Sequence, residues 1–547
     1  MYEISPEHPV AYFCTEYGLK SSLPIYAGGL GILAGDTIKE ADDRKFPLIA
    51  VGLLYRGEGV KQKVDDDGRQ IEEDFHYDPL SEGVEHVYID EMPLFIKVHL
   101  TQIDVWCRCW KETLRNGNVL YLLDTETDQN LLQERNITHA LYSGTEEAII
   151  KQQLILGIGG VKLLHALNIH PSLYHINEGR PAFLHWQLIR HFMDQGGLTY
   201  EEAAKKAREK TVYTNHTLVG AGNPGYNINL LRMYGQYYAD KMGISIDQLL
   251  EPGMENNAEN FVVTRFALNV SCKASGVSKL HTELSKKSWP EYNWCNVTNG
   301  VHMPTWQDPE IRDCNKDKTD LWFVHKKKKQ ELMEFVRQQT GFGYDPERLV
   351  ISWARRIAEY KQLNKLFEDI DRLTKIVKDP TRPIQILISG KAHVLDTRGK
   401  MILQEAINFM QGELNGYAIY IPNYNIDIGK MMTKGSDVWL NDPVYGMEAS
   451  GTSGMKAISN GVLHFTVPDG WSYEVDWDGI GFVIDPKNTA SSIYDILETQ
   501  IIPLYYERDP ENIPQRWLKM MKRSIELSKQ FSTTRMFDEY VSLLYKK

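Results

Sequence analysis

The sequence predicts an α/β protein with two doubly wound domains, each built on a mostly parallel sheet, and an antiparallel insertion in the first domain. Three observations support this fold class. Short apolar runs alternate with longer helical patterns in two separate series. The length of 547 residues exceeds the size at which one hydrophobic core keeps growing. The 41 glycines fit the many turns that connect strands to helices in such folds.

The first series of strands starts close to the N-terminus. Apolar runs of strand length occur at residues 10–14, 48–55, 173–176 and 210–214. From about Gly57 to Glu126 the pattern changes, because Asp-Gly and Asn-Gly turns separate segments in which apolar and polar residues alternate. We interpret this region as an antiparallel insertion of hairpins (about 57–126) within an N-terminal domain of residues 1–320.

A long helical pattern covers residues 148–168, where apolar side chains recur every three or four positions. It predicts a buried helix. The segment Gly157-x-Gly159-Gly160 lies inside this pattern, with no strand directly before it. It therefore does not qualify as a dinucleotide-binding fingerprint.

The second series begins near Arg348. Strands are expected at 349–353, 384–390, 417–421, 437–440, 462–467 and 481–485. The polar stretch 308–344 marks the boundary, so a C-terminal domain covers residues 345–513 and a helical tail covers residues 514–547. Because doubly wound sheets bind ligands at the carboxyl ends of their strands, both domains are expected to face one cleft.

Composition excludes several classes of partner. A net charge of -12 argues against nucleic acid or a membrane surface, and the basic run Lys326–Lys329 fits the polar face of a helix. The six cysteines show no paired framework and no Cys-x-x-Cys spacing, so we expect reduced thiols and no metal site. No run of about 18 apolar residues occurs. A cytoplasmic protein is expected.

The segment Glu448-Ala-Ser-Gly-Thr-Ser-Gly-Met-Lys456 combines a glycine-rich turn with one lysine. Gly451 and Gly454 permit close backbone approach, and Thr452 and Ser453 are good helix N-caps, so free N–H groups are expected to converge on an anion. A lysine one turn later suits the attachment of pyridoxal phosphate, which needs an amine at one end and an anion site at the other.

Two further segments suit anions. Gly28 and Gly29 lie in a loop just before a helical pattern, which indicates either a site for an anion or sugar oxygen or simply a tight turn. Arg355, Arg356 and Lys361 follow a predicted strand. Three cations close together at a strand end are costly to bury unless an anion binds there, so this segment indicates an anion site. The alternative is that the segment is a solvated loop without a ligand.

Together with the lysine turn, these segments resemble the α-glucan phosphorylases (glycogen, starch or maltodextrin), in their shorter bacterial form. The resemblance runs through most of the chain, in the order Tyr12-Phe-Cys-Thr-Glu16-Tyr, Tyr26-Ala-Gly-Gly-Leu-Gly, Gly52-Leu-Leu-Tyr-Arg, Ile137-Thr-His-Ala-Leu-Tyr, His175-Ile-Asn-Glu-Gly, Tyr213-Thr-Asn-His-Thr, Val297-Thr-Asn-Gly-Val, Arg355-Arg-Ile-Ala-Glu-Tyr-Lys, Ser389-Gly-Lys-Ala and the lysine turn. It implies two Rossmann-like domains facing a central cleft, as in two-domain glycosyltransferases of the B type.

The resemblance also implies an activity. Inorganic phosphate would cleave the terminal α-1,4 bond at the non-reducing end of a glucan and give α-glucose 1-phosphate with retained configuration. Pyridoxal 5′-phosphate, covalently attached to Lys456, would assist proton transfer through its phosphate group. We expect a homodimer, without the phosphorylation and nucleotide switches of the eukaryotic enzymes.

Site residues follow from the matching motifs. Those implied for catalysis are Lys456, Arg356, Lys361, His216 and Glu448. Those implied for the cofactor, besides Lys456, are Arg355, Tyr424, Thr452, Ser453 and Gly454. Those implied for substrate binding are Gly28, Gly29, Asn299, Ser450, Gly451, Tyr360, Glu178 and Arg180. The substrate phosphate would be held by Arg356, Lys361 and the glycine loop. The glucosyl unit would contact His216, Asn299, Glu448, Ser450 and Gly451.

Two positions depart from the family pattern. Arg180 stands where the family usually has histidine, toward the acceptor side, and would either stack on an acceptor sugar or narrow its subsite. Asn425 stands where many relatives have arginine. Two other hypotheses stay open on the sequence alone: a nucleotide-sugar-dependent glucosyltransferase resembling glycogen synthase, which would not need Lys456, and a glucan-binding relative with weak activity.

Overall fold

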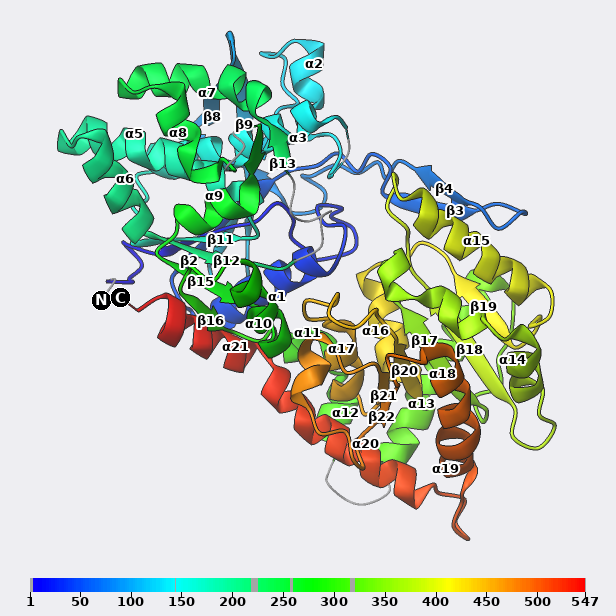
Figure 1. Ribbon diagram of the computed structural model, residues 1–547. Helices are drawn as coiled ribbons and strands as arrows, with labels where there is room; N and C mark the ends of the chain where they lie inside the picture. The colour runs from blue at the N-terminus through cyan, green and yellow to red at the C-terminus, as the bar shows by residue number, and fades with distance from the viewer. Residues whose placement is uncertain (1–2, 143, 218–224, 256–258, 315–319, 547) are drawn as a thin grey trace. The chain divides into compact units, whose positions relative to one another are not determined.

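The computed structural model describes residues 3–142, 144–217, 225–255, 259–314 and 320–546 (Figure 1). The chain forms two compact units. Unit 1 consists of Met1–Glu58, Asp74–Val297 and Met536–Lys547, and unit 2 consists of Gly59–Glu73 and Thr298–Arg535. Each unit has its own sheet and hydrophobic core.

Among the described residues of unit 1, ten strands form one sheet. Parallel pairing connects, in spatial order, β16 (Trp294–Asn296), β15 (Lys273–Gly276), β12 (Thr211–Thr214), β11 (Leu173–Asn177), β1 (Val10–Phe13), β2 (Leu48–Leu53) and β10 (Val119–Asp124). Antiparallel pairing then adds β9 (Ile103–Thr113), with β8 (Phe95–Leu100) and β5 (Glu85–His86). The predicted mixture of a parallel sheet and antiparallel hairpins is confirmed.

The helices of unit 1 connect these strands. They are α1 (Gly29–Asp43), α2 (Leu132–Arg135), α3 (Glu146–Leu154), α4 (Gly160–Ala166), α5 (Leu184–Gly196), α6 (Tyr200–Glu209), α7 (Ile228–Met242), α8 (Ile246–Leu250), α9 (Val263–Asn269) and α10 (Lys279–Ser288). The predicted buried helix corresponds to α3 and α4 with a π-helical turn between them. A Cβ on Gly157 would lie 2.4 Å from the backbone nitrogen of Leu184, so this glycine serves helix packing.

Within the described part of unit 2, six strands form a parallel sheet. Their order is β19 (Ala418–Ile421), β18 (Ile384–Ser389), β17 (Leu349–Ala354), β20 (Val438–Asn441), β21 (Leu463–Thr466) and β22 (Phe482–Val483). The direction in which successive strands are added reverses between β17 and β20. This is the topological switch point at which doubly wound sheets bind ligands.

Helices cover both faces of this sheet, as β17 illustrates. Leu349, Ile351 and Trp353 belong to one core cluster, while Val350 and Ala354 belong to another, because successive side chains of a strand point to opposite faces. The described helices of this unit are α11 (Met303–Trp306), α12 (Pro309–Asp313), α13 (Asp320–Thr340), α14 (Ile370–Val377), α15 (Thr397–Gln411), α16 (Ile426–Gly435), α17 (Ser453–Ser459), α18 (Thr489–Ile496), α19 (Ile502–Tyr506) and α20 (Gln515–Ser528). The helix α21 (Thr533–Glu539) leads into the last segment of unit 1.

The chain divides differently from the expected single boundary. The hairpin of β3 (Lys61–Val64) and β4 (Gln70–Glu73), expected in the N-terminal domain, belongs to unit 2 (Figure 1). The Gln62 amide donates to the Gly390 carbonyl (3.2 Å) and accepts from the Tyr420 hydroxyl (2.9 Å). The expected helical tail is also divided, since Met536–Lys547 belongs to unit 1.

The basic run on α13 is helical, but two of its lysines are not on a solvated face. Lys328 and Lys329 are 4% and 1% exposed. The Lys329 ammonium lies 2.6 Å from the Asp437 carboxylate, at the start of β20. The expectation of a polar face is wrong for these two residues, because partners distant in sequence compensate their charges.

No helix in the described ranges is long and apolar enough to cross a membrane. No disulfide joins the cysteines in the part of the chain that the structure describes. Among the same residues, no group of three or more histidines, cysteines or acidic residues is arranged to hold a metal ion.

Candidate active site

The predicted residues of unit 2 gather at the switch point of its sheet. Arg355 directly follows β17, and Asp442 directly follows β20, so both lie at the carboxyl ends of adjacent strands. The turn from Glu448 to Gly454 continues from β20 into α17, which carries Lys456. The fold therefore brings cations, an acidic residue and the lysine turn to one edge of the sheet.

Glu448 is the acidic centre of this group. Its Oε2 forms ion pairs with both Arg355 and Lys361, and all three residues are buried. Burial alone would raise the pKa of Glu448, but Lys361 and Arg355 outweigh it and hold the pKa below its usual value. Two cations thus share one carboxylate.

The Arg355 guanidinium has capacity left for another anion. Its Nε and one terminal nitrogen are buried and have no hydrogen-bond partner among the described residues. A buried cation with unmatched N–H groups favours an anionic ligand, since charge-assisted hydrogen bonds compensate the loss of hydration. Asp442, nearby, has its pKa raised to about 7 by burial, against the opposing effects of Trp353 and Arg355.

Arg356 and Lys361, predicted to act together on phosphate, lie in different surroundings. Lys361 is buried with Glu448, whereas Arg356 is exposed and hydrogen-bonds to the Tyr360 hydroxyl. The Lys361 ammonium lies 4.7 Å from the centroid of the Tyr360 ring. Burial raises the pKa of Tyr360, but Lys361 and Arg356 hold it below its usual value overall.

Asp469 fixes the backbone of the Glu448 turn. Its Oδ2 accepts hydrogen bonds from the backbone N–H groups of Gly446 (2.9 Å) and Glu448 (3.0 Å). Burial raises its pKa to about 6 despite these bonds. Gly451 adopts a φ of +81°, a left-handed conformation that favours glycine.

Lys456 is 7% exposed and lies against an aromatic side chain. Its ammonium is 3.8 Å from the centroid of the Trp306 ring, which comes from α11. Tyr424 lies near the same indole, since both side chains approach Gly429. A Cβ on Gly429 would lie 3.0 Å from the Tyr424 hydroxyl and 3.8 Å from the Trp306 ring. Burial raises the pKa of Tyr424 to about 12, with Arg355 opposing.

The start of α17 differs from the predicted capping. Thr452 is at the N-cap position, but its side chain makes no capping hydrogen bond to the described residues. The Ser453 hydroxyl instead accepts from the Trp439 indole N–H (3.2 Å). Gly454 is required for packing, because a Cβ there would lie 2.4 Å from Cε1 of His464. Asn425, in turn, is the N-cap of α16 and accepts from the Ile428 N–H (3.0 Å).

Two further predicted residues of unit 2 have buried polar atoms that lack a hydrogen-bond partner among the described residues. These atoms are Ser450 Oγ and Asn299 Oδ1. Such groups are costly to bury unless a ligand or water supplies the missing bond. Both atoms are therefore candidates for ligand contacts.

The predicted residues of unit 1 lie at the carboxyl ends of β11 and β12. His216 donates from Nε2 to Asn177 Oδ1 (2.6 Å), and its backbone N–H donates to Glu178 (3.1 Å). Burial lowers the pKa of His216 to about 3, so the imidazole is neutral at pH 7. Burial raises the pKa of Glu178 to about 7, and its backbone has a φ of +71°.

The glycine loop precedes α1 in the same unit. A Cβ on Gly28 or Gly29 would meet no described atom within 4 Å. The backbone of Gly28 is extended, with φ −160° and ψ −153°. Neither backbone strain nor packing against the described atoms therefore requires glycine here, so both glycines remain candidates for close approach by a ligand.

Three residues of the unit 2 site are absent from the sequence prediction: Trp306, Asp442 and Asp469. The sequence position of Asp442 could have revealed it, since an acidic residue directly after a predicted parallel strand lies at the ligand-binding edge of the sheet. Trp306 and Asp469 had none, because their roles depend on side chains far away in the sequence.

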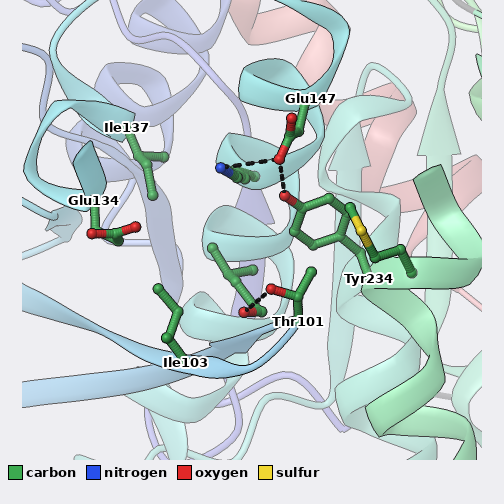
Figure 2. Close-up of a pocket in the computed structure, with 9 residues that line it drawn as sticks. Thr101, Ile103, Glu134, Ile137, Glu147 and Tyr234 are labelled. Carbon is green, nitrogen blue, oxygen red and sulfur yellow. Dashed lines mark hydrogen bonds and ion pairs between the residues drawn. The ribbon is translucent and has the colours of Figure 1, made fainter. Parts of the chain in front are cut away.

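A cavity of about 200 Å³ lies elsewhere in unit 1 (Figure 2). Figure 2 shows the Tyr234 hydroxyl directed at the Glu147 carboxylate, to which it donates a hydrogen bond. None of the predicted site residues lines this cavity.

Comparison with known proteins identifies the family. Residues 310–479, which include the lysine turn, match the carbohydrate phosphorylase family. A maltodextrin phosphorylase of Thermococcus litoralis is 37% identical over 99% of this chain and 71% of the relative. A glycogen phosphorylase of Aquifex aeolicus is 34% identical over 100% of this chain and 87% of the relative.

An uncharacterized protein of Methanocaldococcus jannaschii is 32% identical over 98% of this chain and 100% of its own length. Similarity at this level over nearly the whole chain confirms the family prediction and its enzyme class. The chain belongs to the carbohydrate phosphorylase family.

Proposed function

We propose that the protein is an α-1,4-glucan phosphorylase that releases α-glucose 1-phosphate from the non-reducing end of a glucan. The bond from C1 of the terminal glucose to the glycosidic oxygen breaks, and a bond from C1 to a phosphate oxygen forms. The glycosidic oxygen receives the proton that phosphate gives up. Configuration at C1 is retained.

The observation that carries this proposal is the buried group of Arg355, Lys361 and Glu448 in the unit that also buries Lys456. With one carboxylate between two cations, the group has positive charge to offer two phosphates: Lys361 to the substrate phosphate and Arg355 to the cofactor phosphate. The unpartnered N–H groups of Arg355 are the donors that a bound phosphate would use.

The surroundings of Lys456 fit pyridoxal 5′-phosphate. Lys456 supplies the amine for covalent attachment, Trp306 and Tyr424 supply aromatic walls, and Arg355 supplies donors for a phosphate group. We assign Thr452, Ser453 and Gly454 to the same site through their position on the turn. When bound, this cofactor offers a phosphate group that gives and accepts a proton beside the substrate phosphate.

Two adjacent phosphates explain why so many cations are needed. Like charges about 6 Å apart repel by about 3 kcal/mol per unit-charge pair at an effective dielectric constant of about 20. Arg355, Arg356 and Lys361 offset that repulsion. The same negative charge would stabilise the positively charged sugar that develops as the glycosidic bond breaks.

A neutral glucosyl unit requires directional hydrogen bonds. His216 is suited to this because its neutral imidazole, with Nε2 donating to Asn177, presents Nδ1 as an acceptor for a hydroxyl. Ser450 and Asn299 supply buried polar atoms. We assign these three residues, with Glu448 and Gly451, to the sugar hydroxyls, and Glu178 and Tyr360 to the substrates.

We also propose that the protein is cytoplasmic and does not bind nucleic acid. The six thiols fit the reducing cytoplasm, and the charge of -12 argues against nucleic acid. We propose a homodimer, which light scattering coupled to size-exclusion chromatography would test. A dimer mass is expected, and a monomer mass at micromolar concentration would contradict it.

Absorbance and activity together test the function. The purified protein is expected to show a near-ultraviolet or visible cofactor band that Lys456→Ala removes, and to form glucose 1-phosphate from maltodextrin and phosphate. A colourless protein that transfers glucose from ADP-glucose would support the nucleotide-sugar alternative. Glucan binding with no turnover would support the weakly active relative.

A further inference from the structure

Two side chains of unit 1, those of Tyr142 and Glu16, link Arg180 to the glycine loop. The Arg180 guanidinium lies over the Tyr142 ring, 4.5 Å from its centroid. The Tyr142 hydroxyl donates to Glu16 Oε1 (2.7 Å). The other carboxylate oxygen, Oε2, accepts from the backbone N–H groups of Ala27 (2.7 Å) and Gly28 (3.1 Å). A continuous series of contacts therefore runs from Arg180 to the residues before α1.

Glu16 fits closely against the loop. It is 3% exposed, and a Cβ on Gly31 would lie 2.7 Å from its Oε2. The Glu16 carboxylate accepts from Tyr142 on one side and from two backbone N–H groups of the loop on the other. The position of this carboxylate therefore determines the position of the loop backbone. Little room exists for an alternative arrangement.

Tyr142 is also held in place. Its φ of +59° lies in the left-handed region, which non-glycine residues seldom adopt without support from their surroundings. The Thr15 hydroxyl lies 3.1 Å from the Tyr142 hydroxyl. Burial, and secondarily Glu16, raise the pKa of Tyr142, while Arg180 opposes this rise. Both charged partners thus act on the tyrosine that joins them.

We propose that Arg180 is a positioning residue for the glycine loop, acting through Tyr142 and Glu16. A cation over the ring draws electron density from the phenol and makes its hydroxyl a better donor to Glu16. Glu16 then keeps the Ala27 and Gly28 peptide groups oriented. The inference rests on the proposed function, in which this loop contacts the substrate phosphate.

Amide hydrogen exchange tests the positioning directly and without turnover. The full-length protein, carrying whatever cofactor it retains on purification, is compared with Arg180→Ala, Tyr142→Phe and Glu16→Gln. Exchange in peptides covering residues 26–31 is expected to rise at least several-fold in all three variants. The matched control is Tyr234→Phe, which removes another tyrosine-to-glutamate hydrogen bond, to Glu147, at the cavity in Figure 2. It is expected to leave residues 26–31 unchanged.

Kinetics separates positioning from direct acceptor contact. Tyr142→Phe loses one hydrogen bond to a charged group, worth about tenfold, so KM for phosphate is expected to rise about tenfold while KM for maltodextrin changes less than twofold. Arg180→Ala is expected to show the same pattern, and Arg180→Lys to restore part of the loss by keeping a cation over the ring.

The outcomes are distinguishable. If Arg180→Ala raises only KM for maltodextrin and leaves exchange in residues 26–31 unchanged, Arg180 is an acceptor contact and the inference is overturned. If the wild-type protein does not use phosphate at all, the proposed function fails, while the exchange experiment still decides whether Arg180 positions the loop.

Discussion

The Lys361 ammonium and the Glu448 carboxylate form a buried ion pair at the switch point of the unit 2 sheet. Because Arg355 shares the same carboxylate oxygen, neither cation has an ion-pair partner of its own among the residues that the structure describes. A protein gains little stability from such an arrangement, since desolvation offsets the attraction. The arrangement is better explained by a ligand that brings negative charge.

Lys361→Ala is therefore expected to lower kcat/KM for phosphate about 100-fold or more, because truncating one partner of a buried charge pair between a protein and its ligand typically costs about 2–5 kcal/mol of binding. Binding of maltodextrin, measured by titration calorimetry, is expected to change little. The control is Lys365→Ala, which removes a partly exposed lysine paired with Glu368. Equal losses in phosphorolysis and in maltodextrin binding would count against the phosphate role.

Trp306→Leu is expected to weaken retention of the cofactor. The Trp306 ring centroid lies 3.8 Å from the Lys456 nitrogen to which the cofactor would be attached, so the indole forms an aromatic wall of the proposed site that leucine does not replace. The measurement is the cofactor absorbance that remains after prolonged dialysis, compared with the wild type. Trp289→Leu, in unit 1, is the control. Equal retention in all three proteins would show that Trp306 does not support the cofactor site.

Much of this site follows from sequence periodicity. The apolar run that became β17 and the cations after it are adjacent in the chain, so the position of Arg355 at a strand end was predictable. The same holds for the lysine turn after β20. Local sequence is sufficient wherever one strand and the residues directly after it make the site.

Partners distant in the sequence account for what could not be predicted. Arg355 and Arg356 are neighbours, yet one is buried with Glu448 and the other is exposed, because successive residues leaving a strand point in opposite directions. Lys329 can be buried because its ammonium pairs with the Asp437 carboxylate, and this partner lies 108 positions away in the chain, outside the reach of a local pattern. The β3–β4 hairpin likewise joins unit 2 through Gln62 contacts that no local pattern announces.

Asp442→Asn tests the pH dependence of stability. Burial raises the pKa of Asp442 to about 7 from 3.8, so the folded state resists its ionisation. The stability that the protonated form provides is complete below about pH 4 and is lost as pH rises through about 7. The variant is expected to match the wild-type melting temperature at pH 4.5 and to exceed it at pH 8.

Asp66→Asn serves as the control for that comparison, since Asp66 is exposed in the turn between β3 and β4. It is expected to follow the wild type at both pH values. A melting temperature of Asp442→Asn that falls below the wild type at pH 8 would mean that the ionised carboxylate is stabilised by its surroundings, contrary to the raised pKa.

Gly28→Ala and Gly454→Ala separate a glycine that serves a ligand from one that serves packing. A Cβ at position 28 meets no described atom within 4 Å, so the melting temperature is expected to stay within about 1 °C of the wild type while KM for phosphate rises about tenfold. At position 454 the Cβ would lie 2.4 Å from the His464 ring, so overpacking is expected to cost about 1–3 kcal/mol and lower the melting temperature. Phosphorolysis kinetics and thermal melting of both variants give the comparison. If Gly28→Ala left KM for phosphate unchanged, the open space above the loop would not be a phosphate site, since a methyl group there would obstruct the close approach that this role requires.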